Sequence, residues 1–143
     1  MILGVDPGLR RVGLAVADEE TRVALPFDVI DVRSVDPVLR IAELARERGA
    51  NAIVVGRPVG LSGREGPAVK AQREFLLQLR TAVSIPVEEF DERLTTVIAE
   101  RSLRAHGSSA GTRAKIRDAV AAQVMLQGYL DAKGHPKTAE SKE

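Results

Sequence analysis

The chain contains no cysteine and no tryptophan, and aromatic residues make up only 3% of its 143 residues. Without thiols it can form no disulfide, zinc–thiolate site or iron–sulfur cluster. The scarcity of aromatic rings argues against a platform on which several nucleobases stack. Only two histidines are present, which disfavours a histidine-based metal site.

An excess of charge of one sign is also lacking, because 21 Lys and Arg balance 20 Asp and Glu to a net charge of +1. This excludes a protein that binds nucleic acid through bulk positive charge, although a local basic patch remains allowed. No apolar run approaches the ~20 residues of a membrane helix. The opening MILGVDPGLRR lacks the pattern of a signal peptide. We expect a cytoplasmic protein with no membrane partner.

Apolar segments and turn residues divide the chain into strands and helices. Apolar runs predict strands at 1–5, 12–17, 23–32, 52–55 and 85–90. Apolar residues at helical spacing predict helices from Pro37 to Gly49, 67–82, about 95–107 and 114–130, with a flexible loop at 107–112. Strands followed by alternating helices and strands indicate an α/β fold with a mixed five-stranded sheet. We expect one domain over 1–132 and a polar, disordered tail over 133–143.

Two groups of acidic residues follow predicted core strands. Asp6 ends the first strand in the turn sequence DPG, and Asp91 and Glu92 follow the last strand. Ordinary explanations exist, because Asp favours turns and acidic residues favour helix entries. Sites in open α/β sheets, however, form beyond the carboxyl ends of strands. If the two strands are parallel neighbours, their acids converge.

A third acid, Asp118, lies on a predicted helix that is apolar nearly all round. A buried carboxylate without a partner would cost several kcal/mol, roughly, so a cation should meet it. The candidates are an arginine, in a buried salt bridge, and a divalent metal. Three converging carboxylates would suit Mg²⁺ or Mn²⁺. A pair of such ions would support hydrolysis of a phosphodiester by water.

Basic residues cluster near the same places in the sequence. Arginine can grip phosphate in a bidentate manner, although most surface charges are simply solvated. The Gly-rich stretch GRPVGLSGREG is no Walker A loop, because no Gly-Lys-Ser/Thr closes it. The candidate phosphate-binding residues are Arg10, Arg11, Arg57, Arg64, Arg113, Lys115 and Arg117.

Four stretches, GVDPGLRRVGLAVAD, IVVGRPVGLSGREGP, FDERLTTVIAE and DAVAAQVMLQGYLD, occur in the order and spacing of one family. Over residues 3–131 the chain resembles the YqgF (RuvX) family of pre-16S rRNA nucleases and Holliday-junction-resolvase-like proteins. The resemblance implies a ribonuclease H-like fold, a mixed sheet of antiparallel hairpins and parallel strands flanked by helices. It also implies a Mg²⁺- or Mn²⁺-dependent nuclease site whose catalytic and metal-binding residues are Asp6, Glu92 and Asp118.

Two positions depart from the family pattern. Related Holliday junction resolvases commonly carry a fourth acid one turn after the last Asp, where this chain has Ala121. Arg57 stands where the family more often has an apolar residue. If Asp91 and Glu92 remain extended, their side chains point to opposite faces, so only one of them should be a ligand.

The resemblance favours a nuclease that processes the 5′ end of precursor 16S rRNA, with precursor rRNA or pre-ribosomal particles as partners. A nuclease specific for Holliday junctions or other DNA structures, acting on branched or single-stranded DNA, is an alternative. A non-catalytic ribosome-assembly factor is another. An ATP-binding module, suggested by the likeness of DPGLRRVGLAV to the phosphate loop of actin-like ATPases, is disfavoured because the chain supplies one lobe at most. Monomer and homodimer both stay open.

Overall fold

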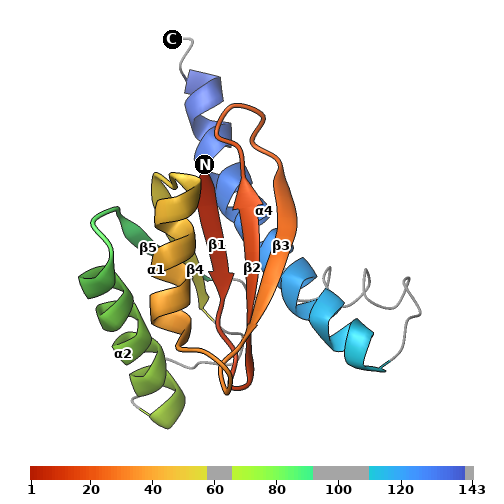
Figure 1. The fold of residues 1–143 in the computed structure, drawn as a ribbon. Coiled ribbons are helices and arrows are strands. Elements are labelled where there is room, and N and C mark those ends of the chain that lie inside the picture. Colours follow the sequence, from red (N-terminus) through yellow and green to blue (C-terminus); the bar gives the residue numbers. More distant parts are fainter. Residues whose placement is uncertain (58–65, 92–109, 141–143) are drawn as a thin grey trace.

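A computed structural model describes residues 1–57, 66–91 and 110–140, with side chains described over 113–133 in the last range. Five strands form one sheet in the order β3-β2-β1-β4-β5. β1 pairs antiparallel with β2, and β2 with β3, whereas β1, β4 and β5 run parallel. The predicted mixed sheet is thus confirmed (Figure 1). The strands are β1 (Ile2–Asp6), β2 (Arg11–Ala17), β3 (Ala24–Asp31), β4 (Ala52–Arg57) and β5 (Val87–Asp91).

Two helices, α1 (Pro37–Arg48) and α2 (Pro67–Ala82), cover one face of the sheet, and α4 (Ala110–Glu140) covers the other (Figure 1). The local signals for α1 are strong. The Asp36 carboxylate accepts a hydrogen bond from the backbone N–H of Val38, which caps the helix start. The helix ends at Gly49, whose left-handed φ of 66° suits glycine.

Alternation along the strands divides the core into two layers. On the α1/α2 side the buried residues include Leu3, Val5, Ile53 and Val55, together with residues of both helices. On the α4 side they include Ile2, Ala15, Val54, Met125 and Leu126. Successive strand residues face opposite sides. The side on which any strand residue lies can therefore be read from its neighbours.

Two glutamines fix α4 along the sheet. The Gln127 side chain accepts from the backbone N–H of Ala24 at 2.8 Å and donates to the carbonyl of Arg22 at 3.0 Å. One turn earlier, Gln123 donates to the carbonyl of Ala24 at 3.1 Å. These bonds join the middle of α4 to the start of β3, so the helix has a defined position along its own axis.

The two ends of α4 differ from the prediction. The helix begins at Ala110, so part of the segment predicted as a loop at 107–112 is helical. It also continues to Glu140, through most of the predicted tail. Extending an existing helix costs little once it is nucleated, which at Gly111 and Thr112 outweighs weak local propensity. The division into a domain at 1–132 and a tail at 133–143 stays a prediction, and the helix predicted at 95–107 lies outside the described residues.

Of the helices in the described ranges, none has both the length and the apolar character to cross a membrane.

Candidate functional site

Asp6 is the last residue of β1, at the carboxyl end of a central strand. Its partner across the antiparallel ladder is Gly13 in β2. Ile2 packs in the α4 layer, and a side chain added at Gly4 would meet Leu126 of α4. Alternation therefore places Asp6, two residues beyond Gly4, on the face that α4 covers.

The backbone of α4 comes unusually close to the sheet at Gly13. A Cβ added to Gly13 would lie 1.9 Å from the carbonyl oxygen of Asp118. Only a residue without a side chain permits this approach. Because Gly13 is paired with Asp6, the close approach brings Asp118 to the same face and the same end of the sheet as Asp6. The structure thus brings together two of the three predicted acids.

Arg11, the first residue of β2, is the cation that meets Asp118. Its Nε lies 2.5 Å from Oδ2 of Asp118, and the two side chains are 30% and 22% exposed. The expectation that a cation would compensate this carboxylate is therefore met by an arginine. A metal ion at the same carboxylate would compete with Arg11, since both neutralise the same negative charge.

The third predicted acid, Glu92, lies outside the described residues. Asp91, the last residue of β5, follows Phe90, which packs edge-to-face on Tyr129 of α4 with ring centroids 5.9 Å apart. By alternation Asp91 lies on the opposite, α2 face, away from Asp6 and Asp118. Within residues 1–57, 66–91 and 110–140, no three His, Cys, Asp or Glu side chains are placed to hold one metal ion. Among the described residues, the two carboxylates of Asp6 and Asp118 are of a kind suited to Mg²⁺ or Mn²⁺.

The predicted phosphate-binding residues fall into different places. Arg10 is exposed in the β1–β2 turn, directly before Arg11. Arg113, Lys115 and Arg117 are exposed on α4, in the turns that precede Asp118. Arg113 and Arg117 share one helix face, whereas Lys115 lies over β3 beside Phe27 and Asp28.

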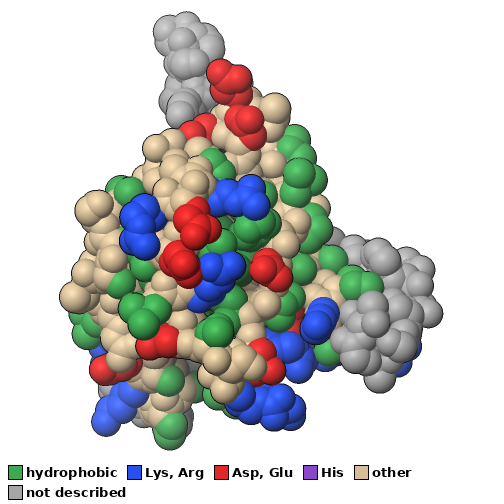
Figure 2. Space-filling model, viewed as in Figure 1, with side chains coloured by type: hydrophobic (Ala, Val, Ile, Leu, Met, Phe, Trp, Pro, Cys, Tyr) green, Lys and Arg blue, Asp and Glu red, His purple; other side chains and the backbone are tan. Residues whose placement is uncertain are grey.

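Arg57 stands apart from this group. It ends β4 opposite Asp91 and lines a small cavity of about 180 Å³ with Gln72 and Glu89 on the α2 face. The structure does not bring Arg57 together with Asp118, and Arg64 lies outside the described residues. Figure 2 shows Lys and Arg side chains along the lower rim of the molecule, at the end of the sheet where β1 finishes.

A hydrogen bond joins α4 to β5. The Tyr129 hydroxyl donates a hydrogen bond to Oε1 of Glu88 at 3.0 Å. Burial, followed by this bond to a carboxylate, raises the pKa of Tyr129 to about 12. The hydroxyl bond to Glu88 and the ring contact with Phe90 both join α4 to β5. Tyr129 lies about three helical turns beyond Asp118 on α4.

Sequence reasoning missed the part played by Gly13. The signal was available, because a glycine inside an otherwise apolar strand marks a bulge or a close backbone approach. What the pattern alone could not tell was which element approaches, since Asp118 lies more than a hundred residues further along the chain.

Comparisons with known proteins show which family this chain is similar to. The family model described as "RuvX: Holliday junction resolvase" matches residues 1–132. A Chloroflexus aggregans protein named "Putative pre-16S rRNA nuclease" is 42% identical over 94% of this chain and 96% of its own length. An Anaeromyxobacter dehalogenans protein of the same name is 45% identical over 90% of this chain and 95% of its own.

Two solved structures share the fold at low sequence identity. Thermus thermophilus RuvC in complex with a Holliday junction substrate superposes with a TM-score of 0.59 at 17% identity, covering 94% of this chain and 95% of RuvC. The fowlpox virus resolvase in complex with Holliday junction DNA gives 0.60 at 10% identity, covering 92% and 97%. The expected ribonuclease H-like fold is thereby confirmed. From its sequence relatives and the match over residues 1–132, the chain belongs to the RuvX family.

Proposed function

We propose that this chain is a divalent-metal-dependent nuclease that hydrolyses phosphodiester bonds in precursor 16S rRNA, at its 5′ end. The observation that carries the proposal is the juxtaposition of Asp6 and Asp118 across Gly13, at the carboxyl end of β1. The names of relatives such as those from Chloroflexus and Anaeromyxobacter support the RNA substrate. The cell compartment that fits this role is the cytoplasm.

Asp6, Asp118 and, by the family resemblance, Glu92 are the residues that would hold Mg²⁺ or Mn²⁺. When bound, the metal supplies an activated water and neutralises charge on the phosphate. The carboxylates contribute hard oxygen donors fixed by a strand end and a helix. Arg11 holds the Asp118 carboxylate in place and partly neutralises it, which limits its repulsion of the other acids.

The exposed basic residues beside these acids are the proposed contacts to the phosphate backbone. Arg10 follows Asp6 in the β1–β2 turn, and Arg113, Lys115 and Arg117 precede Asp118 on α4. Half or more of protein contacts to nucleic acid typically go to phosphate and sugar, and they position the strand without reading its sequence. Arg57, on the α2 face, is proposed to contact a more distant part of the same nucleic-acid strand. Arg64 is also proposed to contact phosphate, and this proposal is based only on its place in the sequence.

A structure-specific DNA nuclease is the second candidate. It is favoured by the fold shared with two resolvases bound to Holliday junctions and by the description of the matching family. Ala121, in place of a fourth acid, counts against junction resolution. Resolvases act as two-fold dimers, so a homodimer would support this candidate and a monomer would support the RNA nuclease.

Cleavage assays distinguish these functions. The wild-type protein should cleave precursor 16S rRNA with Mg²⁺ or Mn²⁺ and should leave a four-way DNA junction intact. Asp6→Asn should lose cleavage while remaining folded, because one metal-binding charge is removed from a strand end. Glu47→Gln, which changes an exposed acid on α1, is the matched control and should cleave normally. Full metal-dependent activity of Asp6→Asn would refute the site, and absence of metal binding would favour a non-catalytic assembly factor.

A further inference from the structure

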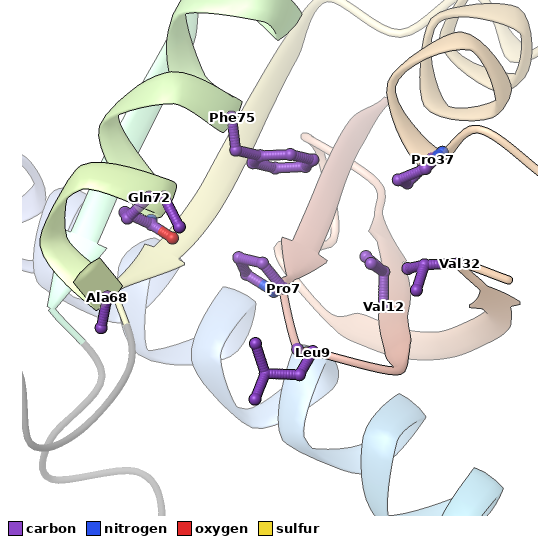
Figure 3. A pocket seen from close by; sticks show the side chains of 10 residues that line it. Pro7, Leu9, Val12, Val32, Pro37, Ala68, Gln72 and Phe75 are labelled. Carbon is purple, nitrogen blue, oxygen red and sulfur yellow. The ribbon is translucent and has the colours of Figure 1, made fainter.

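An apolar pocket of about 380 Å³ opens beside the carboxyl end of β1, on the face opposite Asp118. One wall is the β1–β2 turn at residues 7–9, and the other is the first half of α2. Figure 3 shows the rings of Pro7 and Phe75 across from each other, with Gln72 beside them. Leu9 lies at the edge with 95% of its surface exposed. Within the part of the chain that the structure describes, the pocket and this leucine both present apolar surface to solvent.

Gln72 gives the pocket a single polar group. It is the one polar side chain among the buried residues of the described ranges, with 8% of its surface exposed. Its Nε2 donates to the carbonyl of Gly56 at 3.2 Å and to Oε2 of Glu89 at 3.1 Å. Both partners accept only, so the NH₂ group must face them. The amide oxygen is therefore turned toward the pocket, as Figure 3 shows, and can accept a hydrogen bond from an occupant.

The combination suits a flat apolar group that carries an N–H donor on its edge, which describes a nucleobase. The rings of Pro7 and Phe75 can pack on the face of a base, and the Gln72 oxygen can accept a hydrogen bond from its edge. The first turn of α2 borders the pocket, contains no acidic residue, and has no side-chain cap on its N–H groups. Its partial positive charge favours the phosphate that accompanies a base.

The pocket and the candidate catalytic site lie at the same end of the sheet, on its two faces. Pro7, which lines the pocket, directly follows Asp6, which lies on the α4 face. A strand that crosses the end of β1 can therefore present a phosphate to Asp6 and a neighbouring base to the pocket. Such a base must be unpaired, because a base within a duplex cannot leave the stack without cost.

We propose that this pocket binds one unpaired nucleobase of the strand being cut, next to the scissile phosphate. The proposal rests on the proposed nuclease function and adds to it a requirement for a single-stranded nucleotide at a fixed distance from the cut. The pocket contributes binding and register of the strand, and the carboxylates contribute the chemistry.

The test combines a variant that fills the pocket with a substrate that lacks a base. Ala71→Leu adds bulk at an exposed α2 position on the pocket wall, and Ala68→Leu does the same one turn earlier. Ala82→Leu, at the exposed end of α2, is the matched control. The probe is a single-stranded RNA with the precursor sequence, and a single abasic site is moved through every position. Binding is measured in Ca²⁺ and cleavage in Mn²⁺.

With the wild-type protein and the Ala82 control, one abasic position should weaken binding roughly tenfold, as expected for loss of one bound base. Ala71→Leu or Ala68→Leu should weaken binding of the intact RNA to a similar extent and should no longer respond to the abasic site. The idea fails if no abasic position matters, or if the penalty persists in both filled variants. Cleavage by the wild-type protein then decides separately whether the nuclease function holds.

Discussion

Gly13→Ala is the substitution that tests the proposed geometry most directly. The added Cβ would lie 1.9 Å from the carbonyl oxygen and 2.6 Å from the carbonyl carbon of Asp118. These are backbone atoms of α4, so no side-chain rotation can relieve the overlap. Ordinary contact requires at least 3.4 Å, so the helix must move away by on the order of 1.5 Å.

Two consequences of different size follow. Overpacking of this kind costs about 1–3 kcal/mol of unfolding free energy. For a chain of this length that lowers the melting temperature by roughly 3–12 °C. Displacing Asp118 by more than an ångström from Asp6 should lower the cleavage rate by about 100-fold or more, because catalytic groups tolerate little misplacement. The loss of activity should therefore greatly exceed the loss of folded protein.

The assay pairs thermal unfolding with single-turnover cleavage of precursor rRNA in Mn²⁺. Gly66→Ala is the inert control, because a Cβ there meets nothing within 4 Å. Gly4→Ala is the control for stability, since its Cβ would press on the Leu126 side chain at 3.0 Å without touching Asp118. It should lose stability and keep most of its activity. A Gly13→Ala protein that cleaves at the wild-type rate would refute the argument that this contact positions Asp118.

Three further predictions concern charge. Arg11→Leu should lower the stability of the metal-free protein by about 1 kcal/mol and raise its affinity for Mn²⁺ several-fold in calorimetry, because the competing cation is gone; unchanged Mn²⁺ affinity would contradict this. Replacing Arg113, Lys115 and Arg117 by Ala should reduce the slope of log K against log salt by about 0.7–0.9 per lost phosphate contact, and an unchanged slope would make them solvated residues. Tyr129 has its pKa raised to about 12 from an ordinary value of 10, so it stabilises the fold below pH 10, and this contribution is lost as pH rises to 12. Since it is the only tyrosine, tyrosinate absorbance follows it directly, and a midpoint near 10 in the folded protein would contradict the contact with Glu88.

Local signals in the sequence predicted α1 and α2 well. Asp36 and Pro37 start α1 and Gly49 ends it, and each acts through atoms within a few residues. The start of α4 at Ala110 was missed because Gly111 and Thr112 have weak helix preferences that the rest of a long helix overrides. Prediction succeeded where the interactions that determine an element join residues close together in the chain.

The features of the candidate site also differ in whether they depend on neighbouring or on distant residues. The position of Asp6 at a strand end, and the need of Asp118 for a cation, follow from neighbouring residues. The identity of that cation does not, because Arg11 and Asp118 are 107 residues apart. The pocket was missed for a related reason, since its walls come from residues 7–9 and from α2. Such groups become neighbours only through the pairing order of the sheet.

The bonds that Gln123 and Gln127 make to the start of β3 fix how far along the sheet each residue of α4 lies, Asp118 included. Asp118 lies nine residues before Gln127, a length of about 13.5 Å along the helix axis. One residue inserted between them would turn Asp118 by about 100° around the axis and away from Asp6. Evolution can therefore lengthen or shorten the surface loops of this protein, but the number of residues between the glutamine and the acid has to stay constant.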